Sequence, residues 1–341
     1  MTLSAWQTLR AELQREERAW LVSGAAGFIG SHLAETLLGL GQRVVGLDNL
    51  STGFRRNLDE VQEAVGRKAW QRFQFVEGDL ADAELCRELC AGGPLVLHQA
   101  ALGSVPRSLA QPRASFESNV HGFFHLMDAA RRGGSPAFVY ASSSSVYGDD
   151  PGLPRRESNL GAPLSPYAAS KRIDEILAQT FQRCYAQPNV GLRYFNVFGP
   201  RQDPDGAYAA VIPRWAQSLL AGERPELHGD GSSSRDFCPV SAVVQANLLA
   251  AWRAEACQGR VYNVALGGSL SLLQLFERLR DLAGLGAELQ PHFGPERAGD
   301  VRHSLADLSA IQGDLGYAPE EDFEDALARC LDWYRAAGTR K

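Results

Sequence analysis

The stretch from residue 20 to residue 48 constrains the fold of this chain more than any other. An apolar run leads into Gly24, Gly27 and Gly30, which stand three residues apart, and a second apolar run ends at Asp48. A strand, a glycine-rich turn, a helix and a second strand in this order predict one βαβ unit closed by an acidic residue.

Each residue of this unit has an expected role. Gly24 would make the tight turn, Gly27 would let backbone N–H groups approach a pyrophosphate, and Gly30 would let the helix pack closely on the strand. Asp48 follows at about the interval at which an acid binds an adenine ribose hydroxyl, which favours NAD over NADP. The arginines at positions 55–56 temper that preference. The alternative is a glycine-bearing turn that binds nothing.

Composition limits the remaining classes of protein. With 341 residues and 45% apolar content, the chain can form one large α/β domain or a main domain with a smaller lobe. A net charge of −6 argues against a nucleic-acid partner. Residues 2–18 have the spacing of a surface helix rather than a signal peptide, and no apolar run is long enough to span a bilayer. We therefore expect a cytoplasmic protein without a membrane or nucleic-acid partner.

The six cysteines include no C-x-x-C pair and no histidine at ligand spacing, so we expect no metal site. They are expected to be buried thiols in a reducing compartment. Their positions are Cys86, Cys90, Cys184, Cys238, Cys257 and Cys330.

Strand and helix patterns alternate up to about residue 198. This alternation predicts an α/β fold with a doubly wound, Rossmann-type parallel sheet over residues 1–198. Beyond Gly199 the pattern changes to mixed short elements, which predicts a smaller mixed α/β substrate lobe over residues 199–341, interleaved with the first. Further strands are expected at 72–76, 94–98, 137–141 and 189–195, and helices at 54–65, 81–90, 114–132 and 166–185.

Two segments carry candidate chemistry. Ser165 and Pro166 are typical of a helix start, so Tyr167 would lie at the positive end of the helix, with Lys171 one turn later on the same face. A free tyrosine has a pKa of about 10, and bringing a phenol to about 7 requires roughly 4 kcal/mol in favour of the anion. The serine run at 142–145 ends a strand, where a hydroxyl could contact a reacting alcohol. Taken alone, the first segment would be a surface Tyr and Lys on an amphipathic helix, and the serine run would be a polar loop without chemistry.

The motifs together resemble the extended short-chain dehydrogenase/reductase family. They are the three-glycine turn, the Ser-Ser-Ser-x-Val-Tyr-Gly type run at 142–148, the Tyr-x-x-x-Lys pair, and the strings at 192–196 and 235–237. Longer strings at 98–108, 206–213 and 299–304 resemble bacterial UDP-N-acetylglucosamine 4-epimerases of surface-polysaccharide synthesis.

This resemblance implies a role for each matching residue. Tyr167 would be the catalytic base, Lys171 would hold the nicotinamide ribose and assist the phenol, and Ser143 would hydrogen-bond the sugar; the extra Ser142 leaves the choice of serine open. The NAD-binding residues would be Gly24, Gly27, Phe28, Ile29, Gly30, Asp48, Asn49, Ser51, Thr52, Gly53, Asp79, Leu80, Gln99, Ala100, Ala101, Asn119, Tyr167, Lys171 and Phe195.

A UDP-N-acetylhexosamine is the substrate that the resemblance implies. His228 departs from the frequently aromatic residue of relatives near the uracil, which puts stacking there in doubt. The substrate-binding residues would be Gly103, Ser104, Ser143, Ser144, Tyr167, Asn196, Ala210, Val211, His228, Arg235, Arg297, Asp300 and Ser304.

The implied reaction is inversion at carbon 4 of the sugar through a transient 4-keto intermediate, with the cofactor regenerated. Related dehydratases carry an Asp-Glu pair, and decarboxylases a Glu, where this chain has Ser144 and Ser145, so these rivals are weaker. A UDP-glucose or UDP-uronate epimerase and a non-enzymatic NAD-binding regulator stay open. The small Ser304 and Gly103 would leave space for an acetamido group. The resemblance also implies a homodimer formed through the helices at 114–132 and 166–185.

Overall fold

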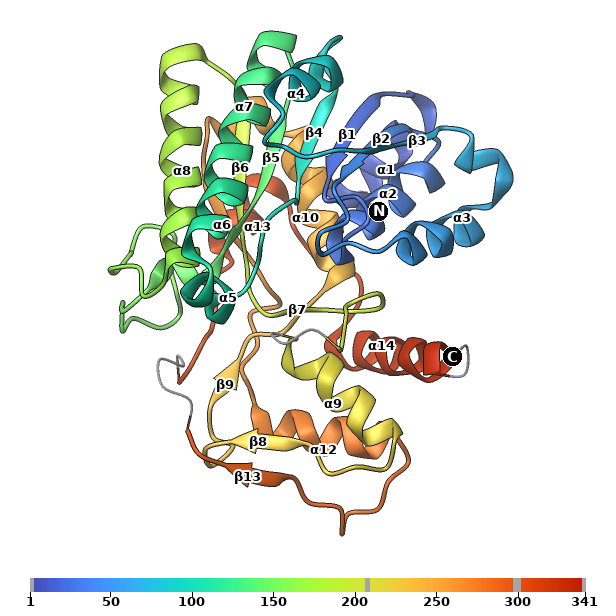
Figure 1. The fold of residues 1–341 in the computed structure, drawn as a ribbon, viewed down its shortest axis with the longest axis vertical. Coiled ribbons are helices and arrows are strands. Elements are labelled where there is room, and N and C mark those ends of the chain that lie inside the picture. Colours follow the sequence, from blue (N-terminus) through green and yellow to red (C-terminus); the bar gives the residue numbers. More distant parts are fainter. Residues whose placement is uncertain (1–2, 206–208, 297–301, 339–341) are drawn as a thin grey trace.

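A seven-stranded parallel sheet organises the molecule (Figure 1). The computed structural model describes residues 3–205, 209–296 and 302–338. The strand order is β11-β6-β5-β4-β1-β2-β3, so the order reverses between β1 and β4. The strands are β1 Ala19–Ser23, β2 Arg43–Asp48, β3 Phe73–Glu77, β4 Leu95–His98, β5 Phe138–Ser143, β6 Asn189–Tyr194 and β11 Val261–Val264.

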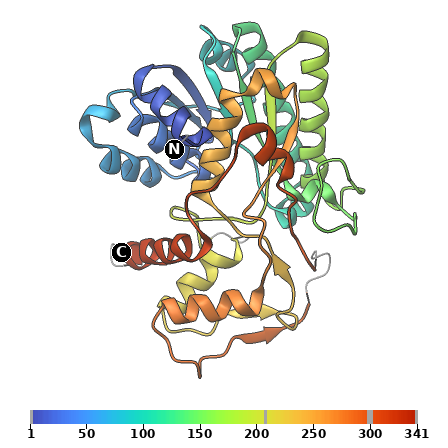
Figure 2. The same cartoon turned by 180° about the vertical axis from the view of Figure 1, so that it is seen from behind.

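Helices cover both faces of the sheet, as a doubly wound fold requires (Figures 1 and 2). One apolar core joins the sheet to α1 Ala5–Arg15, α2 Phe28–Gly39, α10 Val240–Trp252 and α13 Ser309–Leu315, and α3 Arg55–Trp70 packs against α2. The core of the opposite face includes α4 Ala83–Cys90, α7 Gly122–Gly133 and α8 Pro166–Tyr185. The Rossmann-type fold expected from the alternation of strands and helices is therefore confirmed.

A smaller lobe lies below the carboxyl ends of the strands. Its own core gathers α9 Val211–Leu220, α12 Leu272–Leu282, α14 Phe323–Gly338 and β8 Glu226–His228. Between its elements the chain returns to the sheet through α10 and β11, so the two lobes interleave (Figure 1). The remaining short elements are α5 Val105–Ala110, α6 Pro112–Phe116, η2 Ser144–Tyr147, β7 Val197–Phe198, β9 Ser234–Arg235, β10 Cys238–Pro239, α11 Ala254–Cys257, β12 Leu270–Ser271 and β13 His292–Gly294.

The helix expected at 114–132 is not uniform. The chain runs through α6, then a π-helical turn, η1 Glu117–His121, and then α7. The wider turn holds Asn119 inward, where its side chain accepts from Leu102 N at 2.8 Å and donates to Ser170 Oγ at 3.1 Å. Such π turns commonly occur at functional sites. Here the turn connects the loop after β4 to α8.

Two further expectations can be compared with the structure. The amphipathic N-terminal helix is confirmed as α1, which buries Trp6, Leu9 and Leu13. The prediction that all six cysteines are buried is wrong at Cys184, which is exposed near the end of α8, while the other five are buried. Within the described residues, no helix is long and apolar enough to cross a membrane, and no cluster of three or more His, Cys, Asp or Glu is placed to hold a metal ion.

Candidate active site

The glycine-rich turn forms a tight cradle at the carboxyl end of β1. Gly24 has a φ of +73°, and a Cβ there would lie 2.8 Å from the backbone nitrogen of Ala100. A Cβ on Gly30 would lie 2.0 Å from the carbonyl oxygen of Gly24. Only glycine fits these positions, because the turn, the start of α2 and the loop after β4 approach one another backbone to backbone. Gly27 stands at the N-cap of α2, so the helix N-terminus faces the cavity described next.

This turn borders a cavity of about 350 Å³ at the point where the strand order reverses. Open α/β sheets bind ligands at such points. Fourteen of the nineteen expected NAD-binding residues line it: Gly24, Gly27, Phe28, Ile29, Gly30, Asp48, Asn49, Ser51, Thr52, Asp79, Leu80, Gln99, Ala100 and Ala101. Gly103, which we expected to contact the substrate, also lines this cavity.

Asp48 supports the cradle as well as lining the cavity. Its carboxylate accepts hydrogen bonds from Ala26 N at 2.9 Å and from Leu50 N at 2.8 Å. A Cβ on Gly53 would lie 2.9 Å from both carboxylate oxygens, so Gly53 leaves room for Asp48 rather than lining the cavity. Burial raises the pKa of Asp48. The acid at the end of β2 was expected from the sequence, but its hydrogen bond from Ala26 N in the glycine-rich turn was not.

The other four expected NAD-binding residues do not line this cavity. Phe195 is fully buried, with its ring beside Tyr147, and Asn119 holds the loop after β4 as described above. Tyr167 and Lys171 lie on α8, whose N-cap Ser165 accepts from Ala168 N at 3.1 Å and whose first turn begins with Pro166. The expected helix start is thus confirmed in detail.

The two members of the Tyr-x-x-x-Lys pair differ in exposure. Tyr167 is half-buried, whereas Lys171 is 1% exposed and its ammonium Nζ lies 3.4 Å from Oδ2 of Asp174. Near Lys171 lies His98, at the end of β4, whose Nδ1 is 2.7 Å from Ser23 Oγ. Burial, and secondarily the charge of Lys171, lower the pKa of His98 to about 3. His98 is therefore neutral at physiological pH.

The serine run separates into residues with different partners. Ser142 is buried and donates to Oε1 of Glu175 at 2.7 Å. Ser143 is half-buried at the N-cap of η2, where its hydroxyl accepts from Ser145 N at 3.1 Å and from Ser145 Oγ at 3.0 Å. The side chain of Ser142 points toward α8 and is buried, whereas Ser143, Ser144 and Ser145 are half-buried.

Glu175 is held by a buried network. Arg193 on β6 forms a two-point ion pair with it, at 2.8 Å and 2.9 Å, and Arg172 adds a third contact at 2.9 Å. Burial alone would raise the pKa of Glu175, but the hydrogen bonds and charge of Arg193 outweigh it and lower that pKa. This network fixes the middle of α8 against β5 and β6.

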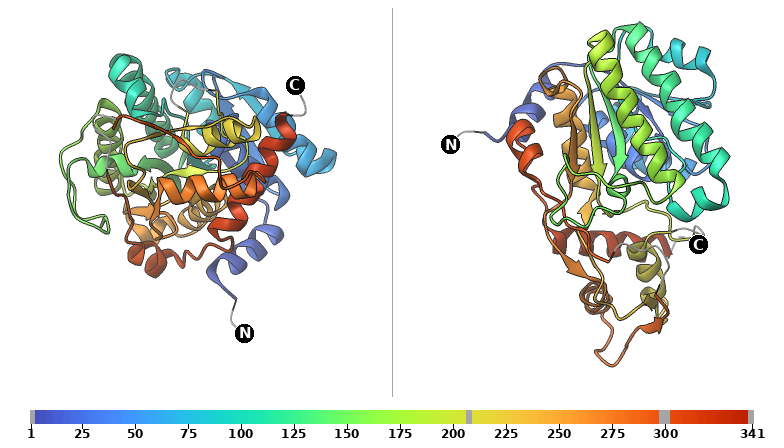
Figure 3. Two further views of the ribbon diagram at one scale, coloured as in Figure 1. Left: turned by 90° about the horizontal axis from the view of Figure 1, so that it is seen from below. Right: turned by 90° about the vertical axis from the view of Figure 1, so that its left-hand side faces the viewer.

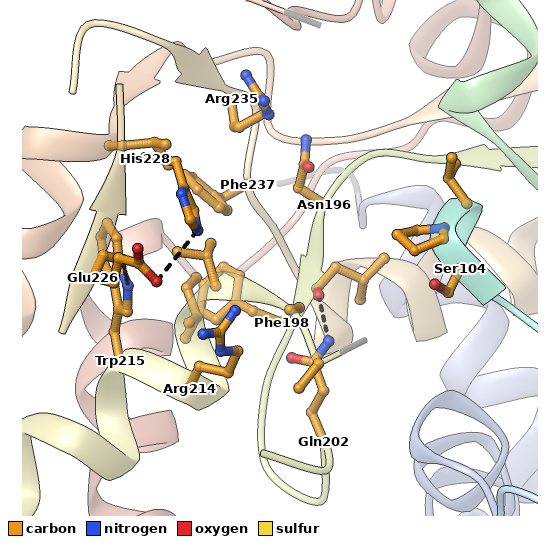
Figure 4. A pocket seen from close by; sticks show the side chains of 18 residues that line it. Ser104, Asn196, Phe198, Gln202, Arg214, Trp215, Glu226, His228, Arg235 and Phe237 are labelled. Atoms are coloured by element: carbon orange, nitrogen blue, oxygen red, sulfur yellow. Dashed lines mark hydrogen bonds and ion pairs between the residues drawn. The ribbon is translucent and has the colours of Figure 1, made fainter. Parts of the chain in front are cut away.

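A second cavity, of about 420 Å³, lies between the sheet and the smaller lobe (Figure 4). Ser104 stands at one end and Glu226 and His228 at the other, with Asn196 between them. Six expected substrate-binding residues line it: Ser104, Asn196, Ala210, Val211, His228 and Arg235. Ser143, Ser144, Tyr167 and Ser304 do not line it, and Arg297 and Asp300 fall outside the described residues.

Arg235 is positioned by its neighbour. The buried carboxylate of Asp236 accepts backbone hydrogen bonds from Leu266, Gly267 and Ala306, each at 3.2 Å, and burial raises its pKa to about 6. Ser304 lies beside this segment, half-buried, and its backbone N–H donates to Ser234 O at 3.1 Å.

Several lining residues were missed by the sequence analysis. They come from α9, β8, the start of α12 and the loops after β7 and β9, and include Gln202, Arg214, Trp215, Glu226, Phe237 and Leu272. Arg214 and Trp215 directly follow the 206–213 string, so extending that string into its helix would have found them. Glu226 is two residues before His228 on the same strand, and its Oε2 lies 3.7 Å from Nε2 of His228. A strand alternates its faces, so this spacing was a usable signal.

The cradle, the open N-terminus of α2 and the acid after β2 fit a dinucleotide. The second cavity combines Arg235 and Arg214 with Asn196 and the aromatic Trp215 and Phe237. Guanidinium groups suit phosphate oxygens, and a concave site of this size suits a small polar ligand. The arrangement can hold a nucleotide cofactor and a phosphorylated substrate on either side of the β4 to α5 loop.

Comparison with known proteins agrees with this reading. The sequence profile described as the NAD dependent epimerase/dehydratase family matches residues 20–265. A UDP-glucose 4-epimerase of Mycolicibacterium smegmatis is 37% identical over 317 residues, which cover 92% of this chain and 98% of that protein.

Two solved structures are similar over nearly their full lengths. The UDP-N-acetylglucosamine 4-epimerase of Methanobrevibacter ruminantium, in complex with UDP-N-acetylmuramic acid, has a TM-score of 0.87 and 37% identity, with 94% of this chain and 99% of that chain covered. The dTDP-glucose 4,6-dehydratase DesIV of Streptomyces venezuelae, solved with NAD bound, has a TM-score of 0.84 and 32% identity, with 94% and 98% covered.

Proposed function

Because the chain belongs to the NAD dependent epimerase/dehydratase family and uses NAD, we propose that it interconverts UDP-N-acetylglucosamine and UDP-N-acetylgalactosamine by epimerisation at carbon 4. The observation that carries the proposal is the placement of Tyr167 and Lys171 in the first turns of α8, which packs against the serine turn η2. That turn has serines at positions 144 and 145, where an elimination would need carboxylates.

The residues of the chain have distinct tasks in this reaction. Tyr167 takes the proton of the 4-hydroxyl, and Ser143 hydrogen-bonds the same oxygen. The positive end of α8 and the Lys171 ammonium favour the phenolate. NAD, when bound, supplies hydride acceptance and return. Positioned proton transfer of this kind contributes about 10²–10⁴-fold to the rate.

The second cavity is assigned to the UDP moiety. Arg235, with its backbone held through Asp236, would bind the diphosphate bidentately, and Asn196 would add a neutral donor. His228 and Glu226, at the far end of the cavity, would face the uracil. The sugar would then extend past Ser104 toward Tyr167, between the two cavities.

The N-acetylated substrate is favoured by small side chains. A Cβ on Gly103 would meet no described atom within 4 Å, so the loop after β4 is open there. Ser304, beside β9, is the second small residue that would border the acetamido group. If Gly103 and Ser304 do not border the sugar, we expect specificity for UDP-glucose, UDP-galactose or a UDP-uronate instead.

We place this reaction in the cytoplasm, in the supply of precursors for surface polysaccharide.

We assign the reaction to a homodimer. Figure 3 shows α7 and α8 side by side on the outside of the sheet. Their outer faces expose Phe124, Ile176 and Tyr185, which are 44%, 50% and 55% accessible. Large apolar groups on two adjacent helices are typical of a self-complementary interface. Sedimentation of the chain and of a Phe124→Ser, Ile176→Ser variant would test the dimer.

A panel assay tests the function. Purified protein is incubated with each of several UDP-sugars without added NAD, and the anomeric and carbon-4 proton signals are followed by NMR. We expect the 4-epimer to form from UDP-N-acetylglucosamine and UDP-N-acetylgalactosamine. Formation of a 4-keto-6-deoxy sugar, or no change in any sugar, would reject the proposal.

A further inference from the structure

Two adjacent carboxylates on α8 have very different surroundings. Glu175 is satisfied by Arg193, Arg172 and Ser142. Asp174, directly before it, is 0% exposed and contacts Lys171, with Oδ2 3.4 Å from Nζ. Its other oxygen, Oδ1, has no hydrogen-bond partner among the described residues. A buried carboxylate with one oxygen unpaired is costly and needs an explanation.

The stability of the fold does not supply that explanation. A buried ion pair generally contributes little to stability, because the cost of desolvating two charges offsets their attraction. Apolar side chains of similar size at the two positions would serve packing as well. The contact between Lys171 Nζ and Asp174 Oδ2 is also weak, since 3.4 Å is long for a charge-assisted hydrogen bond.

The surroundings of the pair leave Asp174 as the counter-charge of Lys171. His98, on β4, is neutral at physiological pH, so it adds no charge. Tyr140, on β5, is fully buried, and burial holds its pKa far above the usual value, so it is neutral as well. On α8 and β6 the charges of Glu175 and Arg193 compensate each other, and Arg172, which also contacts Glu175, is partly exposed to solvent.

The apolar side chains of α7, among them Phe123 and Met127, belong to the same buried cluster as Ala178 and Phe181 of α8. They bring no charge to the pair.

We propose that Asp174 is a positioning residue that acts through Lys171: its buried carboxylate anchors the ammonium beneath the site and limits the positive charge that reaches the Tyr167 phenol. The assignment of Tyr167 and Lys171 as acting groups rests on the proposed function. The role of Asp174 is a further statement about how strongly that lysine acts.

The protonation state of Asp174 supports this role. Burial raises the pKa of Asp174 to about 7, even though Lys171 opposes the rise. The carboxylate is therefore charged at the alkaline pH values at which a phenol loses its proton. In this range it opposes the effect of Lys171 on Tyr167. Among charged groups, Tyr167 would thus respond to Lys171, to Asp174 and to the helix N-terminus, while the neighbouring Tyr194 on β6 stays neutral because burial raises its pKa.

The test follows the phenol itself. The holoenzyme is titrated from neutral to alkaline pH while phenolate absorbance is recorded. The signal of Tyr167 is the difference between the parent chain and its Tyr167→Phe variant. The same difference is then measured between Asp174→Asn and the double variant Asp174→Asn, Tyr167→Phe. The amide keeps the shape and an oxygen for Lys171 but removes the charge. We expect the titration midpoint of Tyr167 to move to lower pH by about one unit.

Controls separate this effect from general damage. Asp128→Asn removes a carboxylate from α7 that pairs with Arg131 and Arg132, and it should leave the midpoint in place. Should Asp174→Asn not fold, Asp174→Ser, whose hydroxyl can still accept a hydrogen bond from the buried Lys171 ammonium, carries the same expectation. An unchanged midpoint, a move to higher pH, or an equal shift in Asp128→Asn would overturn the proposal.

The titration needs no sugar nucleotide, so its result is independent of the proposed substrate. If epimerisation is observed and the midpoint does not move, the proposed function stands and the role of Asp174 falls. If the midpoint moves as expected but no UDP-sugar is converted, the coupling of Asp174 to Tyr167 stands and the proposed reaction falls.

Discussion

Replacing His98 should change how the stability of the protein depends on pH. The ring is 1% exposed, and burial lowers its pKa from about 6.5 to about 3. Between these values the unfolded chain binds a proton that the folded chain does not, so the free energy of unfolding falls as pH falls through this window. One pH unit corresponds to about 1.4 kcal/mol. From pH 7.5 to pH 5, His98 should therefore remove about 2 kcal/mol of stability.

The effect has to be read as a difference between two proteins. Burial raises the pKa of Asp174 to about 7 and that of Asp236 to about 6, so both groups stabilise the fold as pH falls and oppose His98. His98→Asn keeps a partner for Ser23 and removes the titrating ring. Urea unfolding at pH 7.5, 6.5, 5.5 and 5 should show the advantage of the parent chain shrinking by about 2 kcal/mol toward acid.

The control for this experiment is His292→Asn, at an exposed position on β13. It should leave the pH dependence of the parent chain intact. Parallel stability curves for the parent and His98→Asn across this range would contradict this prediction, because they would mean that His98 titrates alike in the folded and unfolded states.

Five other substitutions, two of them controls, have expected outcomes. Gly30→Ala should abolish retention of NAD, measured in the nucleotide released on denaturation, because the new Cβ would lie 2.0 Å from a carbonyl oxygen; Gly39→Ala, with nothing within 4 Å, should retain it. Ser143→Ala should lower kcat by about tenfold to a hundredfold, whereas Ser142→Ala should lower the free energy of unfolding by about 1–3 kcal/mol with turnover intact; the reverse pattern would exchange their roles. Ser304→Tyr should reduce kcat/KM for UDP-N-acetylglucosamine relative to UDP-glucose by about tenfold to more than a hundredfold, and equal losses would show that this residue does not border the sugar.

The sequence predicted most of the cofactor side of the molecule, because that side depends on local rules. The turn at Gly24 requires glycine, the alternation of apolar runs fixes a parallel sheet, and Ser165 with Pro166 fixes the start of α8. These features are encoded within a few residues each, so a single chain shows them without reference to its fold.

What the sequence missed depends on contacts between distant segments. The bond of Ser142 to Glu175 spans 33 residues, and the bond of Asp48 to Ala26 spans 22. β11 pairs with β6 in the main sheet. The sequence could not predict this pairing, because β11 is a short apolar run that follows the change in pattern beyond Gly199. The π turn that carries Asn119 contacts α6, α7 and α8. No local residue preference predicts it.

We propose that this chain inverts carbon 4 without net oxidation, using NAD that it carries and Tyr167 as the base. The most direct measurement is an NMR time course of UDP-N-acetylglucosamine with the purified protein and no added cofactor, run beside Tyr167→Phe. With the parent chain we expect UDP-N-acetylglucosamine and UDP-N-acetylgalactosamine at equilibrium. In the variant we expect turnover lower by about 10²–10⁴-fold, with NAD still released on denaturation. Near-native turnover by Tyr167→Phe, or conversion that consumes an added oxidised nucleotide in equal amount, would contradict it.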